Sequence, residues 1–146
     1  MSLEKSQSAA ELYDQGNQEL AHGEFHSACA AFSSALGKDP SVAAYYLGRG
    51  VARAHLDDLG GALEDLEQAV ALQPDFAAAH ARVGVLRSAV GDVRGAIEAL
   101  GQALQLDPQD ADSNYNRGLL LKQVGDHARA KDDYERWRNL IGDDPT

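Results

Sequence analysis

The chain has little of several features that would place it in a familiar class. It has a single cysteine, Cys29, so no disulfide forms within the chain, and nothing in its cysteine usage indicates an oxidising compartment. No apolar run approaches the roughly 20 residues that span a bilayer, and the first residues lack the apolar core of a signal peptide. We therefore expect a cytoplasmic protein that does not insert into membranes.

Positive charge is also scarce. The sequence has 13 lysines and arginines against 23 acidic residues, a formal net charge of −10. Nucleic-acid binding and attachment to anionic lipid both need a basic face, so neither is expected. Hydrophobic residues make up 44% of the 146, which is enough for a core and argues against disorder. The length suits one compact domain or one short array of repeats.

Only four prolines occur, and three of them, Pro40, Pro74 and Pro108, are equally spaced along the chain (74 − 40 = 108 − 74). Several other columns keep the same step. They hold glycine (Gly16, Gly50, Gly84, Gly118), alanine (Ala28, Ala62, Ala96, Ala130) and a bulky residue (Phe32, Leu66, Leu100, Tyr134). A further small column holds Ala35, Ala69 and Ala103, and its fourth member is Trp137.

Each repeat is predicted to form two helices. In residues 77–110, apolar residues recur at helical spacing in both halves, and Gly91-Asp92 separates the halves as a helix end and an N-cap. The Asp-Pro at the end stops the second helix. Ser41 and Asp75 each follow a proline directly and are predicted to be N-caps.

The pattern resembles the tetratricopeptide repeat, a helix–turn–helix unit whose length equals this step. Residues 77–110 supply Val83-Gly84, Gly91, Ala96, Leu100, Ala103 and Pro108, and residues 9–42 supply Gly16, Gly23, Ala28, Phe32, Ala35 and Pro40. There are departures: Arg53 and Arg87 replace the family's tyrosine, Asp57 replaces the mid-repeat glycine, and Gly142 stands where the fourth proline would be.

The resemblance implies one all-α domain over residues 9–142, a solenoid of eight antiparallel helices in a right-handed superhelix. Its repeats would be 9–42, 43–76, 77–110 and 111–142, with a lead-in at 1–8 and a tail at 143–146. The first helix of each repeat would line the concave side.

No catalytic or cofactor pattern is present: GxxxxGK and HExxH are both missing. Gly48-x-Gly50 lies inside a predicted helix and indicates close helix packing. The acidic run 107–114 resembles the start of a calcium loop, but Tyr115 and Leu121 stand where glycine and glutamate are needed, so we expect a capped helix start.

Other reactive side chains have simpler explanations. His22 and His26 are separated by Gly23 at a predicted turn, so they are expected to be solvated rather than to bind a metal. Cys29 is expected to be a small buried hydrophobe, and the mixed-charge run 132–138 a solvated helix face. We therefore predict no enzyme activity, no cofactor and no metal.

By resemblance, function would lie in a concave, peptide-binding groove. The inward-facing candidates are Tyr13, Asn17, Leu47, Val51, His55, Arg82, Val85, Tyr115, Asn116, Leu119 and Lys122. Small and apolar side chains in the middle favour an extended or helical partner segment with apolar anchors. Arg82 and Lys122 are each candidates to hold one acidic group.

One subgroup of the family clamps a C-terminal carboxylate through five set columns. Here those columns hold Tyr13, Asn17, Gly48, Ala78 and Arg82, of which only Asn17 and Arg82 match. Both lysines are missing, and with them the main attraction for an acidic tail. This argues against a co-chaperone of that kind and leaves other peptide binding open.

Other interpretations remain open from the sequence. The small groove residues would also serve tight curvature with no ligand, and the chain would also suit a recognition module of a larger enzyme or regulator. The last repeat could pair with a second copy to form a homo-oligomer. Trp137, with Leu140 and Ile141, is predicted either to cover the open end of the array or to form that interface.

Overall fold

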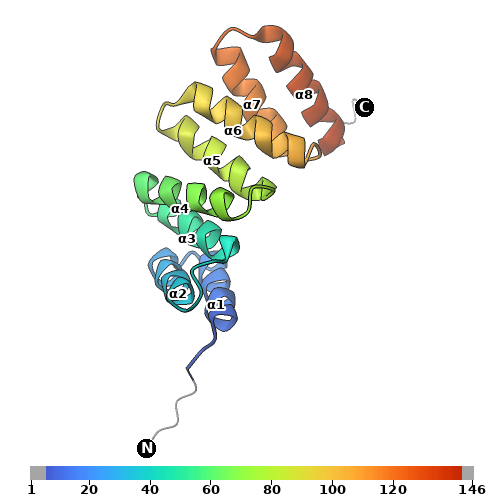
Figure 1. Cartoon of the computed structure of the whole chain (residues 1–146). Helices are drawn as coiled ribbons and strands as arrows, with labels where there is room; N and C mark the ends of the chain where they lie inside the picture. The colour runs from blue at the N-terminus through green and yellow to red at the C-terminus, as the bar shows by residue number, and fades with distance from the viewer. Residues whose placement is uncertain (1–5, 143–146) are drawn as a thin grey trace, which may run out of the picture. The chain divides into compact units, whose positions relative to one another are not determined.

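The computed structural model describes residues 6–142, which form eight α-helices and no strand (Figure 1). The helices are α1 (Ala9–Ala21), α2 (Phe25–Lys38), α3 (Ala43–His55), α4 (Leu59–Leu72), α5 (Ala77–Ala89), α6 (Val93–Leu106), α7 (Ala111–Gln123) and α8 (His127–Ile141). The predicted all-α class and the two helices per repeat are confirmed. In this part of the chain, no helix has the length and apolar character needed to cross a membrane.

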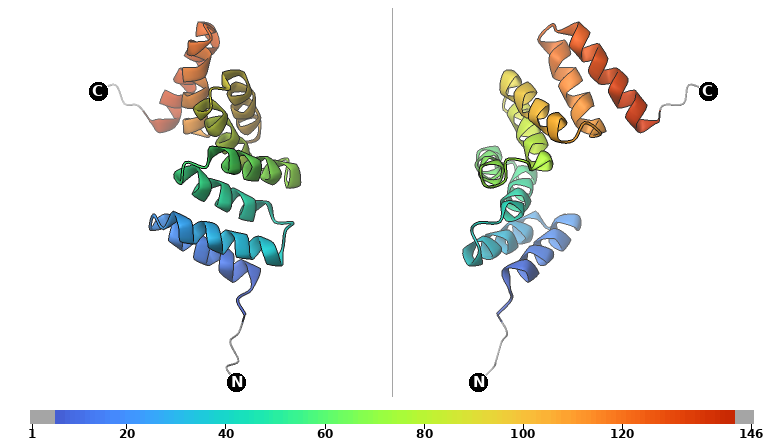
Figure 2. Two further views of the ribbon diagram at one scale, coloured as in Figure 1. Left: turned by 90° about the vertical axis from the view of Figure 1, so that its left-hand side faces the viewer. Right: turned by 45° about the vertical axis from the view of Figure 1, so that its right-hand side comes forward.

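The helices fall into two compact units, Met1–Pro74 and Asp75–Thr146, whose boundary lies in the connection between α4 and α5. In the first unit, α1 pairs with α2 and α3 with α4, and α3 packs on α2. The second unit repeats this scheme with α5 to α8 (Figure 2). Each unit therefore holds two helix pairs, and the superhelix across all four repeats stays a prediction.

Within each repeat, the turn between the two helices has a left-handed residue followed by an N-cap. The left-handed residues are Gly23, Asp57, Gly91 and Gly125, of which only Asp57, with φ of 60°, carries a side chain. In the last three repeats the aspartate that follows caps the second helix: Asp58, Asp92 and Asp126 each accept the N–H three residues on. The predicted stop at Gly91-Asp92 is thus confirmed.

The prediction that Ser41 and Asp75 cap helices is wrong. α3 and α5 begin one residue later, with Val42 and Phe76 as N-caps and no side-chain cap. Ser41 donates instead to Asp39 Oδ1, from its backbone N at 3.1 Å and its hydroxyl at 2.7 Å. These bonds lower the pKa of Asp39. The aspartate before the proline forms a local turn of its own and thereby occupies the serine.

Glycines allow the helices to approach closely around one bulky side chain per repeat. A Cβ at Gly16 would lie 2.7 Å from the Phe32 ring, and one at Gly48, on the following helix, 2.6 Å from it. Phe32 is fully buried between them, which stabilises the fold by about 1.5–3 kcal/mol. The sequence interpretation of Gly48-x-Gly50 as close helix packing is confirmed.

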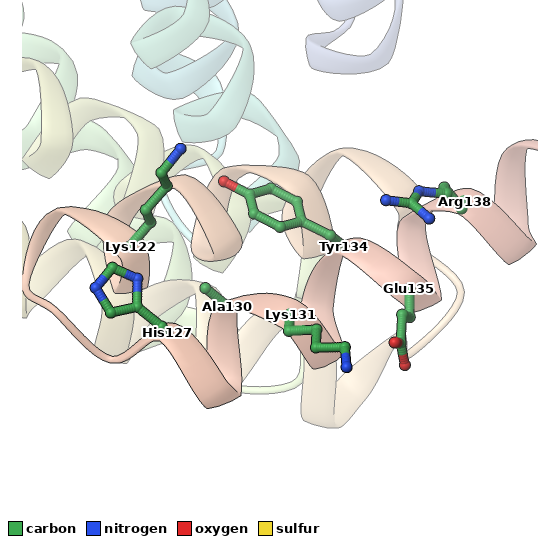
Figure 3. A pocket seen from close by; sticks show the side chains of 7 residues that line it. All are labelled: Lys122, His127, Ala130, Lys131, Tyr134, Glu135 and Arg138. Carbon is green, nitrogen blue, oxygen red and sulfur yellow. The ribbon is translucent and has the colours of Figure 1, made fainter.

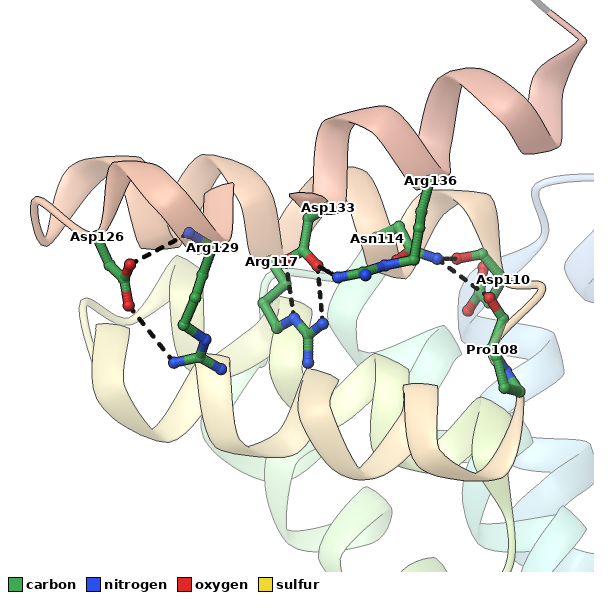
Figure 4. Close-up of polar contacts among 8 residues, drawn as sticks. All are labelled: Pro108, Asp110, Asn114, Arg117, Asp126, Arg129, Asp133 and Arg136. Atoms are coloured by element: carbon green, nitrogen blue, oxygen red, sulfur yellow. Dashed lines mark hydrogen bonds and ion pairs between the residues drawn. The ribbon is translucent and has the colours of Figure 1, made fainter. Parts of the chain in front are cut away.

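Two buried aspartates tie the second helix of a repeat to the first. Asp65 of α4 accepts from Arg49 at 3.0 and 2.8 Å and from Arg53 at 2.8 Å. Asp133 of α8 accepts from Arg117 at 2.8 Å through both oxygens and from Arg136 (Figure 4). Arg53, a departure from the family pattern, thus has a structural partner.

The prediction that residues 132–138 form a solvated face is therefore wrong for Asp133, which is 0% exposed. Burial raises the pKa of Asp133, but the hydrogen bonds and charges of Arg117 and Arg136 outweigh burial and lower the pKa overall. Asn114 is also buried, and its Oδ1 accepts from Arg136 at 3.3 Å.

Candidate interaction groove

A groove runs between α5 and α7, the first helices of the two repeats in the second unit. Its first part, a hollow of about 290 Å³, is lined from α5 by Ala78, Ala81, Arg82 and Val85 and from the other side by Asp110, Asp112, Ser113 and Asn116. The second part, about 270 Å³, is lined by Gly84, Val85, Ser88, Leu100, Asn116, Leu119, Leu120 and Gln123. Val85 and Asn116 line both parts, so the two hollows are adjacent, and together they are called the α5–α7 groove.

The side chains on α5 and α7 explain why the groove is open here. Gly84 lacks a side chain, and a Cβ there would lie 2.6 Å from Leu100, so Leu100 of α6 forms part of the floor. Val85 and Leu119 lie on facing helices and are 44% and 45% exposed. Two apolar side chains that face the same hollow while half exposed are suited to an apolar anchor of a partner.

Charge divides the groove into a polar end and an apolar end. Arg82 and Asp112 line the polar end and are exposed. Asp110 caps α7 and accepts from the Ser113 hydroxyl at 2.6 Å and from Ser113 N at 3.4 Å, so its carboxylate is already occupied. One cation and one accessible carboxylate remain, which matches neither a strongly acidic nor a strongly basic ligand.

Four of the residues predicted for the concave face lie together in this groove: Arg82, Val85, Asn116 and Leu119. Leu120 and Gln123 line it as well. Leu120 was not among the predicted site residues, because α7 has apolar residues at three consecutive positions and helical periodicity does not distinguish them.

Two other candidates in this unit lie elsewhere. Tyr115 packs on Tyr134 and Trp137 of α8, with ring centroids 5.9 and 4.8 Å apart. Lys122 lines a separate hollow between α7 and α8 with His127, Lys131, Tyr134 and others (Figure 3). Neither lines the α5–α7 groove.

The predicted residues of the first unit lie on α1 and α3, which contact each other. Tyr13 is half-buried, with its ring 5.9 Å from Phe32 and 5.1 Å from Tyr45. His55 stacks on Phe25 at 4.3 Å with nearly parallel rings. Asn17 is exposed, while Leu47 and Val51 are half-buried.

The aromatic cluster of the second unit, Tyr115, Tyr134 and Trp137, has a counterpart of three rings in the first unit. Tyr13 and Tyr115 occupy one repeat column, and each packs on the bulky column residue, Phe32 or Tyr134. The third ring beside Tyr13 is Tyr45 of the following helix, whereas the third ring beside Tyr115 is Trp137 of α8. Trp137 therefore provides the third ring that Tyr45 of the following helix provides in the first unit.

Within the described residues, the side chains that could bind a metal do not cluster. Within 6–142, no group of three histidine, cysteine or acidic side chains could hold an ion. Asp110 acts as the N-cap of α7, as expected for a helix start. Gly23 separates His22 from His26 with φ of 75°, and α2 begins only at Phe25. Cys29 is a free thiol, but it is half-buried rather than buried, beside the Ala28–Phe32–Ala52 cluster.

Solved structures with the same arrangement of helices are numerous. A crystal structure of MamA superposes with a TM-score of 0.86 and 21% identity over 92% of this chain and 78% of that one. The first repeat domain of Spaghetti (RPAP3), bound to the HSP90 peptide SRMEEVD, gives 0.78 and 23% over 82% and 95%. The Sgt2 repeat domain from Aspergillus fumigatus gives 0.77 and 23% over 83% and 82%.

Sequence comparison agrees with the fold. No curated protein is similar enough in sequence to count as a relative. The family model described as "Tetratricopeptide repeat" matches residues 13–77, and the one described as "TPR repeat" matches residues 89–125. The helix pairs, the equally spaced columns and these two matches coincide, and the chain belongs to the tetratricopeptide-repeat family.

Proposed function

We propose that this chain is a non-enzymatic protein-interaction module that binds a peptide or helix of a partner protein in the α5–α7 groove. The observation that carries the proposal is the half-exposed apolar pair, Val85 and Leu119, which line the same hollow of this groove. Solved proteins of the same fold support it, since the structure of one of them has a peptide bound.

The groove chemistry narrows the ligand. An apolar side chain would enter between Val85 and Leu119, where Leu100 and Leu120 form the floor. At the other end, Arg82 would pair with a carboxylate of the ligand and Asp112 with a cation. We therefore expect a segment with one medium-sized apolar anchor and mixed charges on one side of it.

A peptide-display selection against the intact chain tests the proposal. Selected peptides should share an apolar anchor, and their affinity should fall at least about tenfold with Val85→Glu or Leu119→Glu, because a carboxylate would be desolvated beside the anchor. Val90→Glu is the matched control, since Val90 is 51% exposed but does not line the groove.

If the selected peptides lose affinity equally with all three variants, or with none, the groove is not the binding site. Circular dichroism of each variant checks that helix content is unchanged. The same selection with Arg82→Glu separates the polar end from the apolar end: affinity for peptides with an acidic residue should fall, and that for neutral peptides should hold.

A further inference from the structure

The hollow between α7 and α8 corresponds to a place that the following helix fills on the α1–α2 pair and on the α5–α6 pair. It measures about 260 Å³ and is lined by Lys122, His127, Ala130, Lys131, Tyr134, Glu135 and Arg138 (Figure 3). Three repeats earlier, the same columns hold Leu20, Phe25, Ala28, Cys29, Phe32, Ser33 and Leu36. Repeat register therefore allows a direct comparison of an occupied and an open site.

In the first unit, the following helix occupies this place. Ala52 of α3 packs into the cluster of Ala28 and Phe32, with Leu20 and Cys29 beside it. In the second unit, Leu120 of α7 packs in the same way on Ala96 and Leu100. The hollow on the last hairpin is thus shaped to receive the side of a helix.

The lining, however, has changed character. The apolar walls of the first hairpin, Leu20, Cys29 and Leu36, are replaced by Lys122, Lys131 and Arg138. Among residues 6–142, none of these three cationic side chains forms an ion pair, and Glu135 is the one acidic group in the lining. Residues 111–142 hold six of the chain's 13 lysines and arginines, so the cations of an acidic protein gather here.

We propose that the α7–α8 hollow is a second interaction site, for an acidic helix of a partner protein with small residues four positions apart on its contact face. The small residues follow from α3, where Gly48 and Ala52, four positions apart, both pack against Phe32. Tyr134 occupies the Phe32 column and presents a ring of similar size.

The acidic positions follow from the same register. Tyr45 of α3 belongs to the cluster of Leu36, whose column holds Arg138 in the last repeat. His55 stacks on Phe25, whose column holds His127. A partner helix with carboxylates at these two places would meet the Arg138 guanidinium at one end of the hollow and the His127 ring at the other, with Lys122 and Lys131 also in the lining.

A second copy of this chain does not satisfy these requirements. Its first helix, α1, would have to present Asp14 at the Gly48 position and Gln18 at the Ala52 position. A Cβ at Gly48 is already 2.6 Å from the ring beneath it, so an aspartate there prevents the same approach. The acidic charge of α1 suits the cationic hollow, but the side chains of Asp14 and Gln18 are too large for the close approach that the hollow requires.

A designed peptide tests the site. The probe is residues 42–56 of this chain, cross-linked to stay helical and labelled with a fluorophore, with Tyr45→Glu, His55→Glu, Arg49→Gln and Arg53→Gln. Fluorescence anisotropy with the intact protein should show saturable binding. Lys131→Glu should weaken binding about tenfold, because one attraction becomes a repulsion, and Lys122→Glu should have a similar effect.

The matched control is Arg94→Glu on α6, which makes the same change in net charge at an exposed residue outside the hollow. It should leave the affinity within about twofold. A probe with Gly48→Leu should bind at least about tenfold more weakly, because leucine does not fit against the Tyr134 ring.

Three results would overturn the proposal. One is that Lys131→Glu and Arg94→Glu weaken binding equally, which is a general charge effect. Another is that the unsubstituted, basic 42–56 peptide binds as tightly as the acidic probe. The third is an oligomer by light scattering that Asp14→Lys dissociates, because a second copy would then fill the hollow.

Discussion

Replacing Asp133 by alanine should destabilise the protein far more than replacing its neighbour Asp132. Asp133 is fully buried and accepts hydrogen bonds from Arg117 and Arg136. The Asp133→Ala variant leaves the Arg117 guanidinium, whose side chain is only 16% exposed, without its partner. Asp132 is exposed, so Asp132→Ala is the matched control.

The size of the loss in unfolding free energy depends on how far each arginine can become solvated once Asp133 is removed. Removing one partner of a buried ion pair costs about 3–5 kcal/mol. Arg136 is 51% exposed and can turn outward, so it adds little to the penalty. The cost should therefore lie near the lower end, about 3 kcal/mol, or a fall of about 10 °C in melting temperature for a chain of this length.

Urea unfolding followed by circular dichroism measures the difference in unfolding free energy. Asp132→Ala should stay within about 0.5 kcal/mol of the parent. A double variant, Arg117→Met with Asp133→Leu, should recover most of the loss, because no charge is then stranded.

The reasoning fails if Asp133→Ala costs less than about 1 kcal/mol, or if the double variant is no more stable than the single one. The first result would mean that Arg117 reaches water freely. The second would mean that shape, and not the stranded charge, determines the loss.

The pKa of Asp133 is lowered in the folded protein, so its stabilising effect is complete above the ordinary value of 3.8 and is lost as pH falls below it; acid titration of Asp133→Asn by circular dichroism should show a smaller loss of stability in that range. Asp57→Gly should raise stability by about 0.5–1 kcal/mol in thermal melts, because Asp57 has a left-handed backbone, whereas Asp58→Gly should lower it through loss of the α4 cap. Trp137→Ala should lower stability by about 2 kcal/mol with no change in mass by light scattering, because Trp137 covers Tyr115 within its own chain; loss of an oligomer instead would assign Trp137 to an interface.

Repeat spacing was sufficient to predict the helices, their pairing and the close-packed glycines. Columns that recur at one constant step carry that information, because the same contact must form in each repeat. Helix starts after prolines were less predictable, since Ser41 had two competing partners, the α3 backbone and Asp39.

The groove was predicted only in part. Arg82, Val85, Asn116 and Leu119 come together because they occupy the same columns on adjacent first helices. Lys122 does not join them: it lies near the end of α7 and lines the hollow against α8 instead.

The burial of Asp65 and Asp133 is not apparent from the residues adjacent to them in the sequence. In isolation, the run 132–138 alternates charge as a surface helix does. Across repeats, an arginine and an aspartate stand at 49 and 65 and again, at the same separation, at 117 and 133. Comparison of the second and fourth repeats reveals the two Arg–Asp pairs. At the position equivalent to Asp65 and Asp133, the first and third repeats have alanine, Ala31 and Ala99.

The alternation of alanine and aspartate at this position disfavours mispairing of helices during folding. Because the repeats are similar, the second helix of one repeat could pair with the first helix of another repeat. If α4 paired with α1 or α5, Asp65 would face Gln15 or Val83 in place of Arg49, and a buried carboxylate without a cation costs several kcal/mol. A slip by one repeat is therefore penalised, while a slip by two is not, so the unit that the sequence protects against misfolding is the pair of repeats.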